Sequence, residues 1–563
     1  MKSMKSMIRF PLFLITGLCV APLLWAKSAD LILYNGKIFT SDPSRPFAQA
    51  VAVLRDRILA VGADQEVARY ANANTRRIDL KQKLVIPGIN DSHTHFAPMP
   101  PVVNLGLWPD GAPPPDPTFD EVKAAIVTVL SMQTPPAGTW LYADVGGRVF
   151  ADPSATRLAL DQVAPNHPIE LRGWAGHGSI INSAAIRALQ LTERESDPAG
   201  GWYERDAGGN LTGVLHGMAS FGLRSCLAAA VDENVGAAQI RAVAQQAAAL
   251  GITSIQNMSG LPPNKMVRIL NRAGLPIRWR EIPVPGTMQK CPALDVPPLP
   301  IVVPQGNVKL SGVKYILDGT PVERMAFMHE RYLDVPASHF GRLYFTPGEM
   351  GRRLFVNVLS FPQPLLHVAG EATADQLLSL AERNPLSSLF RLLRPRIEHG
   401  DFLGTGDYQV LRRLRAVVVQ NPTHFNIADV FMQRYGPVKT AHAQPLKSLL
   451  REGIPIALGS DGFLHPYINL LLASVHPINP AEAISREEAL RAYTSGSAYA
   501  EFAEREKGTI AAGKLADLAV LSGDVLTLPL PPPPPAPPLQ WFGIHSVLTM
   551  VGGAIVHQTP GLN

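Results

Sequence analysis

The sequence of 563 residues predicts an α/β protein, a (β/α)8 TIM-type barrel with a small β-sandwich domain built from both chain ends. Two observations lead to this fold class. Short apolar runs alternate with helical patterns through the middle of the chain, which is the order of a closed parallel barrel. Both chain ends instead carry alternating apolar and polar residues separated by turn residues, which is typical of paired β-strands.

The composition describes a well-buried globular protein. Hydrophobic residues make up 46% of the chain and charged residues 17%. A chain of 563 residues is longer than a single hydrophobic core accommodates, so we expect a second domain or large insertions. The formal net charge of +5 becomes +2 without the three positive charges of Lys2, Lys5 and Arg9. We therefore expect no nucleic-acid partner.

The first 26 residues predict a secretory signal. Positive charges precede an apolar run from Phe10 to Val20, and the small residue Ala26 offers a cleavage point. The apolar run is short and broken by proline, which disfavours an uncleaved anchor helix. We expect an exported protein, periplasmic or secreted, whose mature chain makes no stable membrane insertion.

The mature chain then contains two cysteines, Cys226 and Cys291. One disulfide and two buried thiols are both open alternatives at this point. Any metal site must rely on His, Asp or Glu side chains.

The chain ends predict the small domain. The segments 30–39 and 50–62 alternate and turn at Asn35-Gly36 and Arg55-Asp56, which indicates β-hairpins. The segments 514–521 and 545–557 give the same signal. We expect residues 27–86 and 508–563 to form the β-sandwich and residues 87–507 to form the barrel.

The middle of the chain predicts eight barrel strands and several long helices. The strands are expected at 84–86, 251–255, 276–282, 308–317, 365–368, 396–398, 416–420 and 454–458. The clearest helices are expected at 234–250, 373–383, 407–415 and 485–506, the last opened by a Ser485/Glu488 capping box.

Two further segments stand out by their composition. Residues 96–232, rich in Gly and Pro, separate the first two barrel strands and are expected to shape the substrate site. Residues 528–538 contain five consecutive prolines and predict an extended polyproline spacer, with a docking role for a partner as the weaker alternative.

Metal-binding residue types follow the expected strands. In a barrel the carboxyl ends of the strands meet at one mouth, so residues at these ends converge. Here they are His93 and His95, Lys314, His367, Glu398-His399 and Asp461. Imidazoles together with a carboxylate are a typical metal-ligand set. The sequence therefore predicts a metal site at the barrel mouth.

The same residues carry a resemblance to a known family. The chain resembles the amidohydrolase superfamily, in particular the YtcJ-like metal-dependent hydrolases (amidohydrolase family 3), from about residue 30 to 557. The matching motifs are Pro87-Gly88 with Asp91-Ser92-His93-Thr94-His95, Lys314 with Asp318-Gly319, Glu398-His399, Gly459-Ser460-Asp461, Gly176-His177 with Asn182-Ser183, and the stretch Lys514 to Asp517. The segment ending in Gly370-Glu371 departs from the Gly-Asp that is usual in relatives.

The resemblance implies a divalent metal centre, with zinc as the expected ion. His93 and His95 would hold one ion, and His367 and His399 a second. Lys314, carboxylated by CO2, would bridge the two, and burial favours the neutral amine that this reaction needs. Asp461 would bind metal and move the proton, and His399 is also assigned to catalysis. A metal-activated hydroxide would then attack a non-peptide carbon–nitrogen bond of a small-molecule, amide-type substrate.

Several alternatives stay open. Lys314 could be a structural lysine beside a single metal ion, His399 an outer hydrogen-bond donor and Asp461 structural. His177 is balanced between substrate contact and packing, and His424 and His465 are expected at the mouth or the surface. The enzyme could instead be an esterase, lactonase or isomerase, or the protein a non-catalytic envelope protein that binds metal or a ligand. Homo-oligomer formation is left open.

Overall fold

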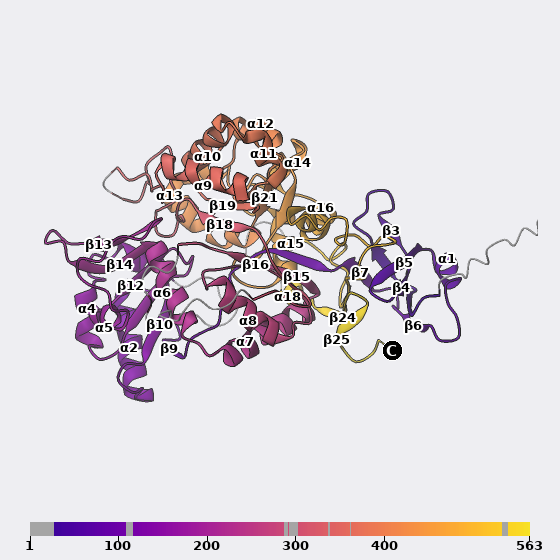
Figure 1. The fold of residues 1–563 in the computed structure, drawn as a ribbon, viewed down its shortest axis with the longest axis horizontal. Helices are drawn as coiled ribbons and strands as arrows, with labels where there is room; N and C mark the ends of the chain where they lie inside the picture. The colour runs from indigo at the N-terminus through magenta and orange to yellow at the C-terminus, as the bar shows by residue number, and fades with distance from the viewer. Residues whose placement is uncertain are drawn as a thin grey trace, which may run out of the picture.

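The computed structural model describes residues 28–107, 116–286, 291, 302–335, 338–360, 362–531 and 539–562 (Figure 1). The predicted signal segment and residues 532–538 of the proline-rich segment lie outside this range. None of the helices searched in the described part of the chain is long and apolar enough to span a membrane.

Two parallel sheets form the centre of the molecule. One has the strand order β17-β16-β15-β8 and the other β18-β19-β20-β21-β22. Apart from β17, most residues of these strands are buried, as expected for parallel strands covered on both faces. The strands are β8 (Ile89–Thr94), β15 (Ile252–Ser259), β16 (Arg278–Pro283), β17 (Val308–Leu310), β18 (Val313–Ile316), β19 (Pro364–Val368), β20 (Arg396–His399), β21 (Val417–Gln420) and β22 (Ile456–Leu458).

Helices alternate with these strands and pack around them (Figure 1). One large apolar cluster joins helix and strand side chains, with the fully buried Trp279 and Tyr467 among its members. The helices are α7 (Glu233–Ala249), α8 (Pro263–Ala273), α9 (Pro347–Ser360), α10 (Glu371–Arg383), α11 (Ser387–Phe390), α12 (Thr405–Leu414), α13 (Ala428–Thr440), α14 (Leu446–Arg451), α15 (Pro466–Val475) and α18 (Leu539–Phe542), with the 3-10 turns η2 (Arg391–Leu393), η3 (Pro422–Ile427) and η4 (Pro480–Glu482). The arrangement is α/β and TIM-barrel-like.

The barrel differs from the prediction in two places. Within the described residues, β8 contacts β22 and β16 contacts β18, but no strand hydrogen bonds join the two sheets, so the ladder is not closed. The expected strand 308–317 is split at Ser311-Gly312, where Gly312 has φ 83°, and its halves belong to different sheets. Only glycine adopts such a backbone without strain, and the chain changes direction there.

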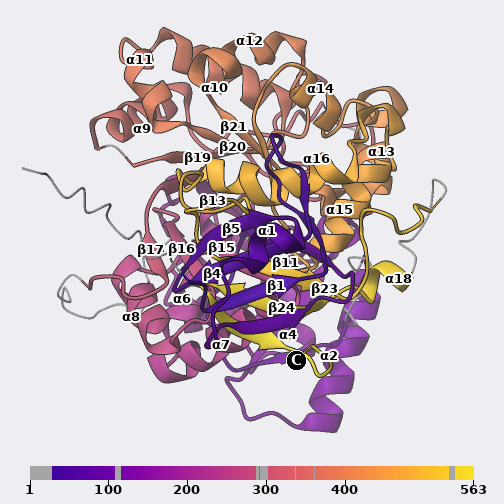
Figure 2. The same ribbon diagram turned by 90° about the vertical axis from the view of Figure 1, so that its right-hand side faces the viewer.

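Strands from both chain ends form two further sheets, which face the viewer in Figure 2. Their orders are β5-β4-β1-β6 and β25-β24-β23-β7-β2-β3, and one apolar cluster includes residues of both sheets. The strands are β1 (Leu31–Tyr34), β2 (Lys37–Phe39), β3 (Phe47–Ala48), β4 (Ala50–Leu54), β5 (Arg57–Gly62), β6 (Arg76–Asp79), β7 (Leu84–Pro87), β23 (Leu518–Leu521), β24 (Ser546–Val551) and β25 (Ala554–Gln558), with the short helix α1 (Asp64–Ala68).

The turn at Arg55-Asp56 joins a hairpin as predicted, whereas the hairpin expected at Asn35-Gly36 is wrong. β1 pairs with β4 and β6, and β2 pairs with β3 and β7, so the chain passes from one sheet to the other at this turn. The run 84–86, which was expected as the first barrel strand, instead forms β7 of an end sheet, so that prediction is wrong. The first strand of the central sheets is β8.

Residues 96–232 form a layer of their own at the left of Figure 1. Their mixed sheet has the order β13-β14-β12-β11-β10-β9. The elements are β9 (Val102–Asn104), α2 (Phe119–Gln133), β10 (Trp140–Val145), α3 (Gly147–Ala151), α4 (Arg157–Val163), β11 (Ile169–Gly173), β12 (Gly178–Ile181), α5 (Ser183–Ala188), β13 (Gly201–Arg205), β14 (Leu211–Gly217) and α6 (Met218–Ala229). A disulfide joins Cys226 of α6 to Cys291, which settles the open choice between a bond and two thiols.

The helix expected over 485–506 ends early. The predicted Ser485/Glu488 capping box is present and opens α16 (Arg486–Arg491). A π-turn η5 (Ala492–Gly496) follows this helix, and α17 (Ser497–Ala500) is the last helical turn. Gly496 lies in the π-turn because an added Cβ would be 2.4 Å from the Ile456 carbonyl oxygen of β22. This close approach interrupts the regular helix.

Candidate metal centre

Five of the six predicted metal-binding residues lie at or near the carboxyl ends of parallel strands, and Lys314 is the second residue of β18. His93 belongs to β8 and His95 follows it, Lys314 lies in β18, His367 in β19, His399 ends β20, and Asp461 follows β22. The rings of His93 and His399 are 4.8 Å apart, and those of His399 and His367 are 4.4 Å apart. The structure therefore brings together the histidines that the sequence placed at separate strand ends.

The tightest group of donor atoms consists of His93, His95 and Asp461. The two Nε2 atoms are 3.0 Å apart, and Oδ1 of Asp461 lies 3.6 Å from Nε2 of His93 and 3.5 Å from Nε2 of His95. Among the described residues these three form a group that could hold a metal ion. Two imidazoles and a carboxylate are the ligand types found in catalytic zinc sites.

Outer hydrogen bonds orient this pair of imidazoles. Nδ1 of His93 donates to Oε2 of Glu398 at 2.6 Å, and Nδ1 of His95 donates to the Met258 carbonyl oxygen at 3.0 Å. Burial alone would raise the pKa of Glu398, but Arg396 and the His93 hydrogen bond lower it well below its ordinary value. Both Nε2 atoms are consequently left to face each other, the arrangement that metal-binding histidines adopt.

A second set of hydrogen bonds holds the backbone around His95. The Asn257 side chain accepts from the peptide N–H of Phe96 at 2.6 Å and donates to the Phe96 carbonyl at 2.9 Å. It also donates to Glu281, which accepts from Trp279 Nε1 as well. Burial raises the pKa of Glu281 to about 8. The sequence reasoning missed Asn257, because only strand pairing reveals that it lies opposite Thr94, next to His95.

Burial favours the neutral imidazole at four histidines of the centre. Burial lowers the pKa of His95 to about 4, and it lowers the pKa of His93, His367 and His399 as well. The neutral imidazole is the form that binds metal ions, so the donor set fits a divalent cation.

Lys314 is fully enclosed by the fold. Its side chain is among the largest buried ones, and Nζ has no hydrogen-bond partner. Burial lowers its pKa to about 8. A buried amine without a partner, held partly neutral, fits the carboxylation that the family resemblance implies.

Backbone features at three residues support the centre. Gly459 directly follows β22 and lies against β8, where an added Cβ would be 2.4 Å from the Cβ of His93, so only glycine fits. His399 and Asp461 adopt φ values of 68° and 39°, which are unfavourable for residues with a side chain. Such strained residues concentrate at functional sites, and both lie among the candidate metal donors.

His424 is closer to the centre than the sequence indicated. Its Nε2 lies 3.3 Å from Oδ2 of Asp461, its Nδ1 lies 3.6 Å from Asp401, and its ring stacks on His399. His399, His424 and Asp461 form a second candidate group for a metal ion. Nδ1 of His399, however, donates to Oδ1 of Asn421 at 2.9 Å, which turns its Nε2 toward the other histidines. Of the two positions expected for His424, the mouth is therefore the correct one.

The other two histidines differ in their surroundings. The His177 ring lies 4.5 Å from that of His367, and its buried Nδ1 has no hydrogen-bond partner. His177 thus extends from the insertion to the metal donors. His465 is buried and its Nε2 lies 3.2 Å from the Phe542 carbonyl oxygen, so the surface position that was one of its two expected positions is wrong.

The motif residues next to Lys314 and His367 have structural contacts. Asp318 accepts hydrogen bonds from three peptide N–H groups and from Thr373, while its contact to Nε2 of His367 is 3.8 Å long. Glu371, which departs from the usual Gly-Asp, accepts from Lys439 at 2.6 Å. The described hydrogen bonds of Glu371 thus come from Lys439 and from the peptide N–H of His329, and none of them involves His367.

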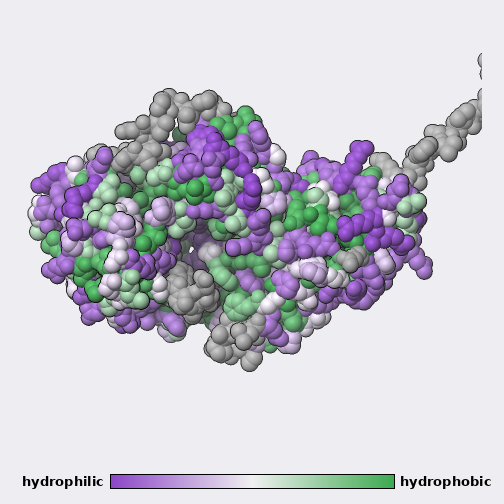
Figure 3. All heavy atoms as spheres, turned by 90° about the horizontal axis from the view of Figure 1, so that it is seen from below, coloured by the Kyte–Doolittle hydropathy of each residue, from purple (hydrophilic) through white to green (hydrophobic). Residues whose placement is uncertain are grey.

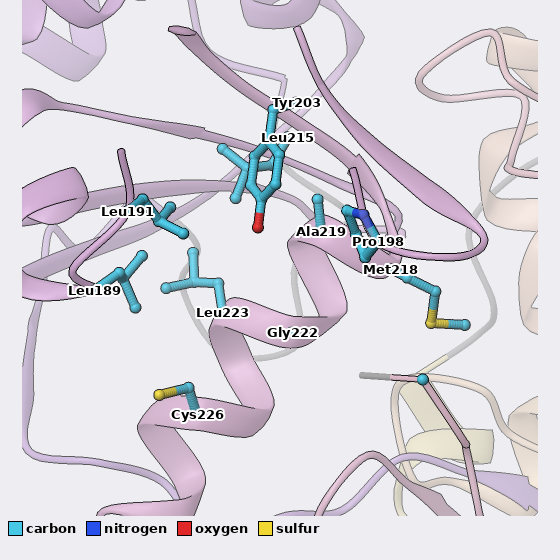
Figure 4. A pocket seen from close by; sticks show the side chains of 11 residues that line it. Leu189, Leu191, Pro198, Tyr203, Leu215, Met218, Ala219, Gly222, Leu223 and Cys226 are labelled. Carbon is cyan, nitrogen blue, oxygen red and sulfur yellow. The ribbon is translucent and has the colours of Figure 1, made fainter. Parts of the chain in front are cut away.

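A small apolar cavity lies elsewhere, between α6 and neighbouring segments of the insertion (Figure 4). Its volume is about 30 Å³, close to the space of one water molecule in the liquid. It is too small for a substrate. The surface in Figure 3 mixes polar and apolar residues and is hollowed near its middle.

Comparison with known proteins identifies relatives over most of the chain. A family model described as "Amidohydrolase family" matches residues 76–557. The N-substituted formamide deformylase of Arthrobacter pascens is 28% identical over 526 residues, which cover 88% of this chain and 94% of that protein. The protein YtcJ of Bacillus subtilis (strain 168) is 24% identical over 560 residues, covering 94% and 99%.

The fold is also similar to that of solved structures. A crystal structure of an uncharacterized metal-dependent hydrolase from Pyrococcus horikoshii OT3 matches with a TM-score of 0.65 and 19% identity. The match covers 88% of this chain and 98% of that one. This likeness supports the TIM-barrel-like fold.

Proposed function

The chain belongs to the amidohydrolase family, and from this premise we propose that it is a metal-dependent hydrolase that cleaves a carbon–nitrogen bond, other than a peptide bond, in a small molecule. The observation that carries the proposal is the group of His93, His95 and Asp461, whose facing donor atoms lie within 3.6 Å of one another. The relative named as an N-substituted formamide deformylase supports an amide-type substrate.

The metal donors divide into two sets. His93, His95 and Asp461 would hold one divalent ion, most simply zinc. His367 and His399, with a carboxylated Lys314, would hold a second, and a single ion at the first set is the alternative. A bound divalent ion would polarise the carbonyl of the substrate and lower the pKa of water.

Asp461 is the residue we assign to proton transfer. Burial would raise its pKa, but the surrounding imidazoles, led by His93, lower it well below its ordinary value. It is therefore ionised at neutral pH and can accept a proton, while Oδ1 is the oxygen that faces His93 and His95. Its other oxygen faces His424 and His399, which keep the carboxylate in place. A positioned carboxylate can then return the proton to the leaving nitrogen.

His177 is proposed as a substrate contact. It comes from the insertion, lies against His367, and has a buried Nδ1 without a partner. Burial lowers its pKa to about 3, so it would present a neutral imidazole to an uncharged group of the substrate.

The test compares amides and esters of the same acyl group with purified, zinc-loaded protein. We expect turnover of N-substituted amides, and loss of turnover when a chelator removes the metal. An esterase or lactonase would hydrolyse only the esters, and an isomerase would release no amine from any member. Bound metal with no hydrolysis of either set would instead favour a metal- or ligand-binding protein.

We also propose that the two central sheets act as one (β/α)8 barrel of residues 87–507, and that the end sheets form a β-sandwich of residues 27–86 and 508–563. The contacts of β8 with β22 and of β16 with β18 support the barrel. The shared apolar cluster of the two end sheets supports the sandwich. Expression of residues 87–507 alone should yield insoluble protein, because the apolar cluster of the barrel would lose its contacts with Ile86, Ala519 and Leu521 of the end sheets.

Export is a further part of the proposal. Residues 1–26 would be removed as a signal, and the Cys226–Cys291 disulfide supports an oxidising compartment such as the periplasm. Mass spectrometry of the protein recovered from the exporting host should find a mature chain that starts after Ala26. Intact chain confined to the cytoplasm would contradict export.

A further inference from the structure

The insertion sheet has two different faces. Leu141, Ala143 and Leu171 of β10 and β11 join an apolar cluster with residues of α2 and α4. Residues in between on the same strands, which point to the opposite face, are polar, and α6 lies over them. The polar set consists of Tyr142, Asp144, Glu170 and Arg172 from the sheet, with Ser179 from β12. The charged groups thus lie on the face that α6 covers.

Two guanidinium groups flank one aromatic ring on this face. Arg172 lies 5.5 Å and Arg224 of α6 lies 6.0 Å from the centre of the Tyr142 ring. Arg172 donates to Asp144, which also accepts from the Tyr142 hydroxyl at 2.7 Å. Arg172 and Asp144 are therefore fully engaged with each other and with Tyr142.

Arg224 is engaged less closely. Its Nε lies 3.7 Å from Oε1 of Glu170, longer than a hydrogen bond, while Glu170 accepts from the Ser179 hydroxyl at 2.9 Å. The Arg224 side chain is 28% exposed. Its guanidinium has N–H groups available to an acceptor from outside the protein.

A row of contacts connects Arg224 to the metal donors. Phe221 lies one turn before Arg224 on the same face of α6. The Phe221 ring is 5.2 Å from that of His177, which is 4.5 Å from that of His367. Since a helical turn rises about 5.4 Å, Arg224 lies on the order of 10 Å from the histidines.

Both ends of this row of contacts are accessible to solvent. The side chain of Arg224 is 28% exposed and that of His95 is 37% exposed.

We propose that Arg224, held in place beside Tyr142 and Arg172, binds a carboxylate of the substrate. The substrate class is then an amide with an extended apolar part, which passes Phe221 and His177, and a terminal carboxylate. A guanidinium suits this role because it offers two parallel N–H donors to the two oxygens of a carboxylate. The inference rests on the proposed hydrolase function.

The kinetic test uses matched pairs of formamides, ω-formamido acids of four, six and eight carbons against N-alkylformamides of equal carbon number. For the best chain length we expect kcat/KM to favour the acid by about 10- to 100-fold. Arg224→Gln should remove most of this preference by raising KM for the acid, with kcat/KM for the neutral partner within about twofold. Arg187→Gln, which changes an exposed arginine of α5, is the matched control.

A binding test separates this inference from the hydrolase function. Calorimetry with octanoate and octanamide should show tighter octanoate binding in the wild-type protein, lost in Arg224→Gln and partly kept in Arg224→Lys. If no formamide is hydrolysed but this difference persists, the proposed function fails and the carboxylate site stands. Equal binding of the two probes, or the same losses in Arg187→Gln, would overturn the carboxylate site. Thermal melting of each variant confirms that it folds.

Discussion

The two sides of the metal centre differ in how their polar atoms are satisfied. On the side of β8, both Nδ1 atoms of His93 and His95 have partners in Glu398 and Met258. On the side of β18 and β19, Nζ of Lys314 and Nε2 of His367 are buried without a hydrogen-bond partner. On the first side, hydrogen bonds within the protein therefore hold the two histidine rings in place.

The difference indicates separate roles for the two sides. A buried polar group without a partner costs about 1–3 kcal/mol, so a fold keeps it only where something else completes it. Metal ions and a carbamate on Lys314 would complete the second side. We therefore expect the first side to determine whether metal binds at all, and the second to determine how many ions are held.

The largest effect is expected from the first side. His93→Ala or His95→Ala should lower kcat/KM by more than about 100-fold. Loss of an outer hydrogen-bond partner of a metal ligand costs up to about 100-fold, and loss of the ligand itself should cost more. Elemental analysis should show the loss of bound metal. His329→Ala, which changes an exposed histidine, is the control. Full activity in both ligand variants would refute the site.

Lys314→Ala tests the second side. Without the carbamate, two cations would face each other with less compensating charge, so the variant should be nearly inactive and hold about one ion in place of two. Acetate or propionate at high concentration should restore part of the rate. Asp461→Ala should respond less to these acids, and Lys309→Ala, an exposed lysine of β17, should behave as wild type. Unchanged metal content and rate in Lys314→Ala would make the lysine structural.

Asn257→Leu tests whether the first side depends on its outer hydrogen bonds. The substitution removes the amide that binds the Phe96 backbone next to His95, and we expect metal affinity to fall by about 10- to 100-fold. Competition with a chelator measures it. Glu281→Gln should stay close to wild type, because the pKa of about 8 keeps Glu281 protonated at neutral pH and Gln retains an acceptor for Asn257. Equal losses in both variants would point to general destabilisation.

The smallest effect is expected from pH. Burial lowers the pKa of His95 from its ordinary 6.5 to about 4, so the ring stays neutral down to that pH. Metal affinity, corrected for the chelator, should therefore be nearly constant between pH 7 and pH 5. For a histidine with an ordinary pKa, protons would compete with the metal below about pH 6.5. A steady fall in affinity from pH 6.5 would show that the fold does not protect the first side.

The sequence by itself determined most of the donor set. His93 and His95 are two residues apart at a buried strand, Glu398 and His399 are adjacent, and Asp461 follows a short apolar run. Such local spacing is readable because strand geometry places these side chains before any long-range contact forms. The alternation of strands and helices in the middle of the chain was predictable for the same reason.

Only the tertiary structure decided how distant segments pair. It assigned residues 84–87 to an end sheet, separated β17 from β18, and moved β1 and β2 into different sheets. It also brought Asn257 to His95 and His424 to Asp461, and joined Cys226 to Cys291. The physical reason is common to all of them: spacing along the chain encodes local conformation, whereas the partner of a strand edge or a side chain depends on the packing of the whole fold.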